Sequence, residues 1–594
     1  MTTVLWDTVW PDADIDAPVA LYVRADGPAE AAPGGGLVVA PNTTAQFDTY
    51  FNGFSATTWL RHTNVTTVVP VVDVDGPCTI RVTHRQGNTP RTLQEMTVNG
   101  PRGVHELLPI DLQTVGHGRL AIGIQAGRGP VVIHEVRWTT TDEPTQPIRL
   151  GMVITTFNRH AELGSNIGRL DMRRQRGGLS TVTELVLVDN AQNLPPELRP
   201  ASALRHCTVV IPNTNCGGAG GFARGLIHLR STKSATHALF MDDDVAFHPQ
   251  IVDRASALLE HATNPTLSIA GAMLSDDAPG HCFEAGARYF AKRVYPIQAL
   301  GKGDDLTSVD DLQVADARDD PIDYAAWWFH AFPIDITDEN PLPVFLRGDD
   351  VAWGLMHTGR TTIATTGVGL WHQGFELKNG PHAWFYDTRN FAIINTLVAP
   401  GYGTRHQVWR YLNITARSLL SFKYASAEHI TAGMNAYLDG PAVLANVDHA
   451  ALDQQVRQFD IEHIEPLPPE HQSRRDTPAA HGLRRYVAAL ASILLLAGHL
   501  QRRRPDSGTR VATAPLQSRA LGASLRHDTI IYRNSDRTHG FVVSRDNQRF
   551  RTGVRAMLST VLRLVVRDRR VARAYRANYP SLISDRTWHA AFKR

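Results

Sequence analysis

Cysteine is scarce in this chain of 594 residues. The four cysteines are Cys78, Cys207, Cys216 and Cys282. None stands in a CxxC pair, which argues against a disulfide framework or a zinc ribbon and fits a reducing compartment. The first 16 residues carry acidic side chains and lack a basic segment followed by an apolar run, so we expect no secretory signal. We therefore expect the protein to stay in the cytoplasm.

Neither a large net charge nor a long apolar run is present. The formal net charge is +2, and 43% hydrophobic with 20% charged residues is ordinary for a globular protein, so the composition favours neither disorder nor a membrane-spanning class. The apolar stretch 487–498 has twelve residues, whereas a spanning helix needs about 20. It either docks on its own domain or lies flat in a membrane interface.

The basic residues gather at the C-terminus. From residue 541 to 594 there are thirteen Lys or Arg and three Asp or Glu. Such a region can meet an anionic surface. It lacks regular aromatic interleaving and a nucleic-acid-binding motif, so we expect no nucleic-acid partner.

The length and the residue patterns predict three domains. Short β-branched runs separated by turn signals predict an N-terminal β-sandwich over 1–145. Strands that alternate with helices then predict an α/β domain of nucleotide-binding type over 148–406. A mainly α-helical, basic domain is predicted over 407–594.

Three consecutive carboxylates follow an apolar strand at 238–241. They are Asp242, Asp243 and Asp244, and they are predicted to lie at the carboxyl edge of the sheet, where open α/β sheets bind ligands. If the strand geometry continues, Asp242 and Asp244 point the same way and can hold Mg²⁺ or Mn²⁺ against a diphosphate. Alone, such a triplet could equally be a solvated acidic turn.

Other strand ends carry residues suited to a nucleotide. The segment TTFNR, 155–159, places a fixed cation, Arg159, where a diphosphate would lie. The pair Asp189-Asn190 ends the next strand and can read a uracil edge or a ribose. The segment NCGGAGGFARG, 215–225, offers glycines for close backbone approach and a helix N-terminus for phosphate, although alone it could be a flexible loop before a helix. It is not the dinucleotide GxGxxG pattern, which makes a Rossmann dehydrogenase a poor fit.

Two clusters farther along the chain offer a base and a further metal ligand. Asp349 and Asp350 stand at a predicted helix start, where the pair could be only a cap. As chemistry, Asp350 would be a general base that takes a proton from an acceptor hydroxyl. His372 is either structural or a third metal ligand. The adjacent Trp327 and Trp328 form either core or a sugar platform, and we expect one of them to face outward.

Together these motifs resemble glycosyltransferase family 2, the inverting, metal-dependent transferases with the GT-A fold. More narrowly, the chain is similar to the polymerising galactofuranosyltransferases of cell-wall galactan (arabinogalactan) synthesis. The motifs that carry the resemblance are TYFNGF (49–54) with Trp59 and Arg61, TTFNR (155–159), NCGGAGGFARG (215–225), FMDDD (240–244), WW (327–328), DDVAWGL (349–355), LWH (370–372), YDTRN (386–390) and YPSL (579–582) with Trp588.

The resemblance implies a role for each candidate residue. Asp350 is the expected catalytic base, and Asp242, Asp244 and His372 are the expected ligands of Mn²⁺ or Mg²⁺. The expected donor-binding residues are Thr156, Asn158, Arg159, Asp189, Asn215, Gly217, Gly218 and Asp243. The expected acceptor-binding residues are Trp327, Trp328 and Asp349.

The function expected from this resemblance is transfer of galactofuranose from UDP-galactofuranose to a lipid-linked galactan acceptor. We expect a homo-oligomer bound peripherally to the inner face of the cell membrane. One alternative is a family 2 transferase that uses another UDP-sugar donor. Another is a non-catalytic carbohydrate-binding protein, which would not need three metal ligands and a base.

Overall fold

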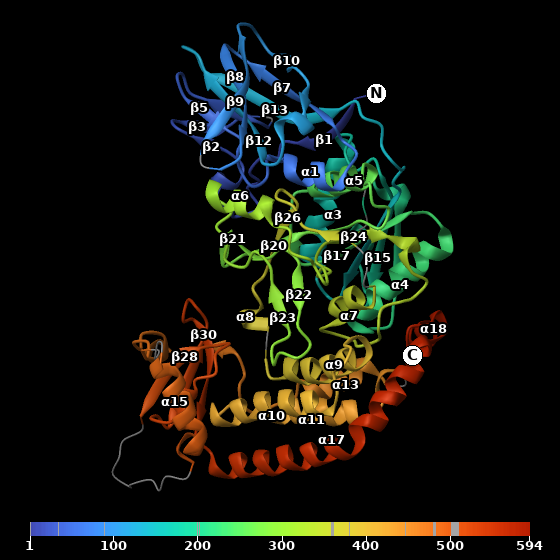
Figure 1. Ribbon diagram of the computed structural model, residues 1–594, viewed down its shortest axis with the longest axis vertical. Coiled ribbons are helices and arrows are strands. Elements are labelled where there is room, and N and C mark those ends of the chain that lie inside the picture. Colours follow the sequence, from blue (N-terminus) through green and yellow to red (C-terminus); the bar gives the residue numbers. More distant parts are fainter. Residues whose placement is uncertain are drawn as a thin grey trace.

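The computed structural model of the chain describes residues 2–593 except 34, 88, 199, 201, 358–360, 379, 446, 479–482 and 500–509. Residues 3–140 form two antiparallel sheets at one end of the molecule (Figure 1). The first sheet contains β1 (Thr3–Asp7), β3 (Ala29–Ala31), β4 (Leu37–Val39), β7 (Thr67–Asp75), β10 (Gly103–Glu106), β11 (Ile110–Asp111) and β13 (Val131–Thr140). The second contains β2 (Arg24–Ala25), β5 (Thr44–Gln46), β6 (Phe54–Ser55), β8 (Cys78–Arg85), β9 (Pro90–Val98) and β12 (Arg119–Ala126). Alternate residues of β8 are buried, and the inner faces of both sheets share one core, the arrangement of a β-sandwich.

Arg119 joins the second sheet to the part of the chain that follows. Its buried guanidinium donates to Asp48 Oδ1 (3.0 Å) and to Thr366 Oγ1 (3.0 Å) and forms an ion pair with Asp316 on α6 (Val309–Ala317). Removing one member of such a buried network leaves an uncompensated charge, which is strongly destabilising. The contact therefore fixes the position of the N-terminal sheets against the central region.

The central region is built on a seven-stranded, mostly parallel sheet. Its strand order is β16 (Thr208–Pro212), β15 (Val182–Asp189), β14 (Leu150–Thr156), β17 (His237–Asp242), β24 (His330–Pro333), β19 (Ser268–Ala270) and β25 (Thr362–Ile363). Helices α3 (His160–Gln175), α4 (Gly217–Thr232) and α5 (Gln250–Glu260) lie between its strands in the chain. β14 is buried along almost its whole length, as expected of a strand covered on both faces. The carboxyl ends of β14, β15 and β17 thereby share one edge.

A smaller four-stranded sheet adjoins the main one. Its order is β18 (Val245–Ala246), β26 (Gly369–His372), β20 (Ala272–Ser275) and β21 (Ala278–Glu284). β18 begins directly after the three carboxylates, with two residues between it and the end of β17, and it pairs Val245 with His372. This pairing brings His372 to the end of β17.

The C-terminal part contains α9 (His382–Val398), α10 (Thr404–Leu420), α11 (Tyr424–Leu438) and the long helix α17 (Asn547–Leu582). Figure 1 shows α17 running beneath α10 and α11, after which α18 (Asp585–Ala591) returns toward α4. The sequence prediction lacked a four-stranded sheet in this part, β27 (Glu465–Pro466), β30 (His539–Ser544), β29 (Thr529–Arg533) and β28 (Val511–Pro515). No helix in the described part of the chain is both long and apolar enough to cross a membrane. The predicted domain boundaries stay predictions.

Candidate active site

Asp242, Asp244 and His372 converge at the carboxyl end of β17. One ligand atom from each lies within 4.8 Å of the others. His372 Nε2 lies 3.3 Å from Asp244 Oδ1, and the other ring nitrogen, Nδ1, lies 2.8 Å from the carbonyl oxygen of Gln373. Because a carbonyl only accepts hydrogen bonds, Nδ1 carries a proton, and this contact orients Nε2 toward the carboxylates, as is usual for a metal-binding histidine. Two carboxylates and one imidazole suit Mn²⁺ or Mg²⁺, so this group could hold the predicted ion.

The electrostatics of the three residues favour a cation between them. Burial, followed by the negative charge of Asp244, raises the pKa of Asp242 to about 6. Burial also acts to raise the pKa of Asp244, but His372 and Lys378 hold it well below its usual range. Burial lowers the pKa of His372, yet the hydrogen bond and the charge of Asp244 raise it overall. The cluster thus has a carboxylate that a bound cation would help to ionise.

Two basic side chains contact Asp244 from other elements. Arg159, which directly precedes α3, forms an ion pair with it, and its predicted role at the diphosphate stays a prediction. Lys378, at the end of α8 (Phe375–Lys378), places Nζ 2.6 Å from Asp244 Oδ2. Lys378 was missed in the sequence because it stands in a short polar segment without a motif. Its position beside the carboxylates suits binding of phosphate oxygens.

The predicted donor residues lie at the ends of neighbouring strands. Thr156 ends β14, and Asp189 ends β15 opposite it in the parallel ladder. Asp189 accepts hydrogen bonds from the backbone N–H groups of Ala191 (3.0 Å) and Leu194 (2.7 Å), which fix the loop after β15. Asn158 adopts a left-handed backbone conformation with φ of 57°. Asp243 is buried, which raises its pKa to about 7.

α4 begins within the glycine-rich segment, at Gly217. Asn215 Oδ1 accepts from the Gly217 N–H (3.0 Å), and Gly217 has φ of +70° with the Phe345 carbonyl pressed against it. A Cβ on Gly218 would lie 3.2 Å from Asp349 Oδ2. Gly217 therefore lets the loop approach the backbone at Phe345, and Gly218 lets it approach Asp349.

Asp349 and Asp350 begin α7 (Asp349–Met356), as predicted, after Gly348 in a left-handed conformation. Burial raises the pKa of Asp350 to about 6. Burial and the charge of Asp350 raise the pKa of Asp349. Glu284, which the sequence analysis missed, has a pKa raised to about 8 by burial and then by Asp350. The pair belongs to the same acidic region as Asp242, because Asp242 acts on both pKa values.

The expectation that one of the two tryptophans faces outward is wrong. Trp327 is 4% exposed and Trp328 7%. Trp327 packs edge-on against Phe222 and Phe240, whereas Trp328 belongs to a different core cluster and donates its Nε1–H to the Gly271 carbonyl (2.9 Å). The two residues lie in a turn and point into two cores, and neither offers an open ring face. The Trp328 ring is nevertheless 6.3 Å from that of His372, so it borders the candidate metal site.

Known proteins resemble this chain along most of its length. The family model described as Galactofuranosyltransferase 2 N-terminal matches residues 29–141. Galactofuranosyltransferase GlfT2 of Mycolicibacterium smegmatis is 24% identical, and the match covers 93% of this chain and 90% of that protein. Galactofuranosyltransferase GlfT2 of Mycobacterium tuberculosis is also 24% identical, with 93% and 91% covered. The chain is a glycosyltransferase similar to these proteins.

Among solved structures, this chain is similar to the crystal structure of S. aureus TarS 1-349. The two chains are 11% identical with a TM-score of 0.31, and the match covers 50% of this chain and 81% of that one. The resemblance to galactofuranosyltransferases that the sequence motifs predicted is confirmed by the two relatives and the family model.

Proposed function

We propose that this enzyme transfers galactofuranose from UDP-galactofuranose to a lipid-linked galactan acceptor, with inversion and with Mn²⁺ or Mg²⁺. The observation that carries the proposal is the convergence of Asp242, Asp244 and His372 beside Asp349 and Asp350. The choice of galactofuranose as the transferred sugar rests on the two relatives, which are both named galactofuranosyltransferase. A non-catalytic carbohydrate-binding protein would have no use for such a cluster.

In the proposed reaction each residue has a distinct task. Asp350 accepts the proton of an acceptor hydroxyl, whose oxygen forms a bond to C1 of the sugar on the face opposite UDP. The bond between C1 and the diphosphate oxygen breaks, and UDP leaves with the electron pair. Arg159 and Lys378 lie where they can bind diphosphate oxygens. When bound to Asp242, Asp244 and His372, a divalent ion neutralises the charge that develops on UDP.

A donor screen tests the proposal. The enzyme is incubated with Mn²⁺, a synthetic lipid-linked galactofuranose disaccharide and either UDP-galactofuranose, UDP-galactopyranose or UDP-glucose, and the products are analysed by mass spectrometry. We expect extension with UDP-galactofuranose alone. Extension with UDP-glucose but not with UDP-galactofuranose would assign the enzyme to another donor.

Replacing His372 by alanine should weaken metal binding more than it lowers turnover at saturating metal. The change removes the neutral ligand and leaves both carboxylates, so we expect the Mn²⁺ concentration for half-maximal turnover to rise about 10- to 100-fold. Saturating Mn²⁺ should restore part of the activity. His261→Ala is the matched control, because that buried histidine contacts Asn64 and lies outside the metal group. An unchanged metal titration in His372→Ala would make His372 a structural residue.

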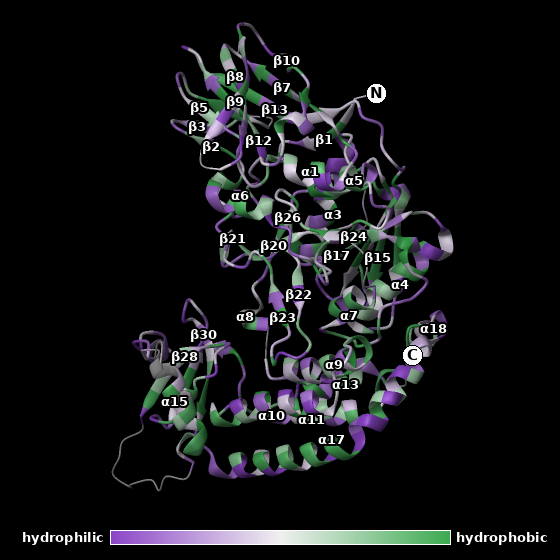
Figure 2. Cartoon of the chain, viewed as in Figure 1, coloured by the Kyte–Doolittle hydropathy of each residue, from purple (hydrophilic) through white to green (hydrophobic). Residues whose placement is uncertain are grey.

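We also propose that the C-terminal part binds the membrane surface where a lipid-linked acceptor lies. α15 (Leu483–Leu494) leaves apolar side chains in solvent, and Figure 2 shows it mostly in hydrophobic colours. Its exposed residues with the turn that follows are Tyr486, Val487, Leu490, Ile493, Leu494 and Leu495. The apolar stretch 487–498 thus does not simply pack inside its own domain. The arginines at 502–504, which follow this stretch in the sequence, lie outside the described residues.

The long helix α17 presents a second exposed apolar stripe. Leu558, Leu562, Val565 and Val566 are 57–72% exposed, and their spacing places them on one helix face. Exposed arginines, including Arg551, Arg555 and Arg569, flank this stripe at helical spacing. An apolar stripe between arginines is typical of helices that lie in an anionic membrane interface. The predicted homo-oligomer stays a prediction, which sedimentation would test.

Co-sedimentation with vesicles tests the membrane proposal. The protein should pellet with phosphatidylserine-containing vesicles at low salt and dissociate at high salt, because each Lys or Arg near an anionic leaflet contributes on the order of 1 kcal/mol. Leu562→Glu with Val566→Glu should reduce the bound fraction several-fold. Val104→Glu is the matched control, because Val104 is exposed on β10 in the N-terminal sheets. Equal pelleting of both variants, or no pelleting of the parent, would contradict this location.

A further inference from the structure

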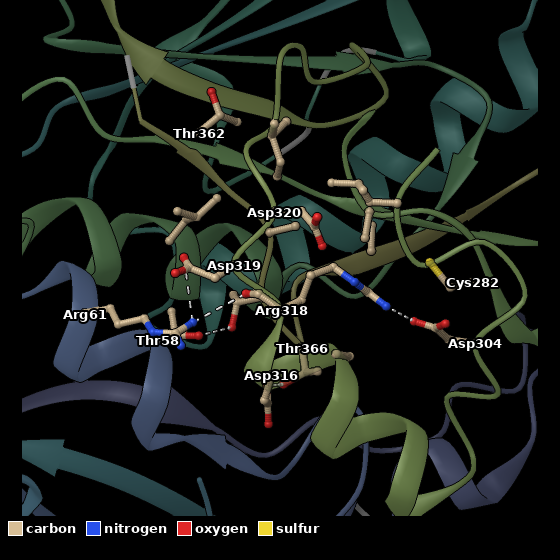
Figure 3. Close-up of a pocket in the computed structure, with 18 of the residues that line it drawn as sticks. Thr58, Arg61, Cys282, Asp304, Asp316, Arg318, Asp319, Asp320, Thr362 and Thr366 are labelled. Atoms are coloured by element: carbon tan, nitrogen blue, oxygen red, sulfur yellow. Dashed lines mark hydrogen bonds and ion pairs between the residues drawn. The ribbon is translucent and has the colours of Figure 1, made fainter. Parts of the chain in front are cut away.

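A cavity lies between the N-terminal sheets and the central region, apart from the candidate active site. Its volume is about 260 Å³. Helix α1 (Ala56–His62) lines one side, α6 and the loop after it line another, and 361–366 closes it. Figure 3 shows Arg61 entering from α1 and Arg318 crossing toward Asp304. None of the predicted metal, donor, base or acceptor residues lines it.

One residue that lines the cavity carries an orphaned polar group. Tyr50 lines it and is 2% exposed, and its Oη has no hydrogen-bond partner among the described residues. A buried hydroxyl without a partner costs free energy, so such a group calls for a ligand or a water molecule. Five threonines also line the cavity, namely Thr58, Thr361, Thr362, Thr365 and Thr366. The Thr58 and Thr365 hydroxyls bond to each other (3.0 Å) and Thr366 contacts Arg119 and Asp316, whereas Thr361, within the described part of the chain, only accepts, from Asn264, and keeps its hydroxyl proton for a ligand.

The charges around the cavity select against an anion. Arg318 is already paired with Asp304 (2.7 Å), and Arg61 lies 3.8 Å from Asp319. Burial and then Arg61 lower the pKa of His62, which leaves this imidazole neutral at neutral pH. Asp320 adds a further carboxylate. The basic groups that line the cavity are thus paired or neutral, so a phosphate or nucleotide would find no unpaired cation among the described lining residues.

The hydroxyl, carboxylate and apolar groups that line the cavity suit a sugar. Threonine hydroxyls donate and accept, and carboxylates accept from hydroxyl groups. Leu300, Leu306, Ile322 and Ile363 supply apolar surface for C–H groups. The volume is at the small end for ligand pockets and leaves room for about one sugar ring.

The cavity and the candidate active site share a short segment of the chain, which limits the distance between them. Thr366 lines the cavity, and His372 follows six residues later at the end of β26. Six residues span at most about 20 Å, even when fully extended. A glycan held at the metal site therefore has its other residues within reach of the cavity.

We propose that this cavity binds a neutral sugar residue of the glycan chain, away from the end that reacts. This inference rests on the proposed function, because it takes the glycan to be the acceptor or product of this enzyme. The site would hold a long glycan between additions while the reacting end stays beside Asp350.

Two substitutions test the cavity with different risks to folding. Tyr50→Phe removes only the orphaned hydroxyl, and Ala315→Phe, on α6, fills the cavity. Tyr575→Phe is the matched control, because Tyr575 is also buried with an Oη that lacks a partner among the described residues, but it lies on α17. Thermal unfolding confirms that each variant is folded.

Calorimetry measures binding of soluble galactofuranose disaccharide and hexasaccharide, with glucose and galactopyranose hexasaccharides alongside. We expect Tyr50→Phe to weaken hexasaccharide binding about three- to tenfold, the loss of one hydrogen bond, and Ala315→Phe to abolish the gain of hexasaccharide over disaccharide. Tyr575→Phe should bind as the parent does. If a different neutral hexasaccharide binds with this dependence on Tyr50 and Ala315 and the galactofuranose hexasaccharide does not bind, the cavity is a sugar site and the proposed sugar is wrong. If all variants bind every oligosaccharide as the parent does, or the parent binds none, the cavity assignment is overturned.

Discussion

Replacing Asp242 by asparagine should lower transfer from UDP-galactofuranose by about 100- to 10,000-fold. Metal stabilisation of a leaving diphosphate is worth several kcal/mol of barrier, and each 1.36 kcal/mol is a factor of ten in rate. Asparagine keeps the shape of the side chain but removes the charge that pairs with the cation. Asp242 also raises the pKa values of Asp349 and Asp350, so its neutralisation affects the candidate base as well.

The measurement is turnover as a function of Mn²⁺ concentration, together with Mn²⁺ binding by calorimetry in the presence of UDP. Asp276→Asn is the matched control, because this exposed carboxylate lies near His372 but outside the group of three ligands. We expect the control to keep turnover within a few-fold of the parent. Asp242→Asn with parental turnover and an unchanged metal titration would remove Asp242 from the metal site.

The local part of this site could be predicted from the sequence because strand ends have a local signature. The apolar runs at 150–154, 185–188, 208–211 and 238–241 all lie within β14, β15, β16 and β17. Parallel strands with crossover helices bring their carboxyl ends to one edge, so polar residues after each run were expected to gather there. The carboxylate pair at a helix start was likewise visible as Asp349 and Asp350 before an apolar segment.

Contacts between segments far apart in the sequence were harder to predict. His372 reaches Asp244 through the pairing of β18 with β26, two strands whose short lengths of two and four residues carry almost no periodicity. Lys378 and Glu284 enter the site from segments without a motif. The small C-terminal sheet pairs β27 and β30 across more than 70 residues of sequence. Its short strands lie between helical segments, which led to the prediction of a mainly helical domain.

The tryptophan pair shows where a local rule fails. Alternation of side chains across a strand would place one of Trp327 and Trp328 outward, but both lie in a turn just before β24. They do diverge, into two different clusters, yet the sheet is covered on both faces, so divergence does not expose either ring. An acceptor role for these residues stays a prediction. It would have to act through the shape of the site beside His372 rather than through an open stacking surface.

Asp350→Asn should lower turnover about 100- to 10,000-fold and leave UDP binding nearly unchanged, because it removes a general base and keeps the side-chain shape. A base works only when deprotonated, and burial raises the pKa of Asp350 to about 6. The parent enzyme should therefore lose turnover as the pH falls through about 6, and the residual activity of Asp350→Asn should lack this acidic limb.

Asp349→Asn provides the internal comparison, since Asp349 is the adjacent carboxylate of the same helix start and faces Gly218. We expect it to affect acceptor affinity more than the pH profile. Turnover is measured from pH 5 to 8 with saturating donor, and UDP binding is measured by calorimetry on the same preparations. If UDP binding disappears together with turnover in Asp350→Asn, Asp350 belongs to the donor site. If Asp349→Asn alone then abolishes the acidic limb while UDP binding persists, the base is Asp349, because a neighbouring charge shifts such a limb but only loss of the titrating group removes it.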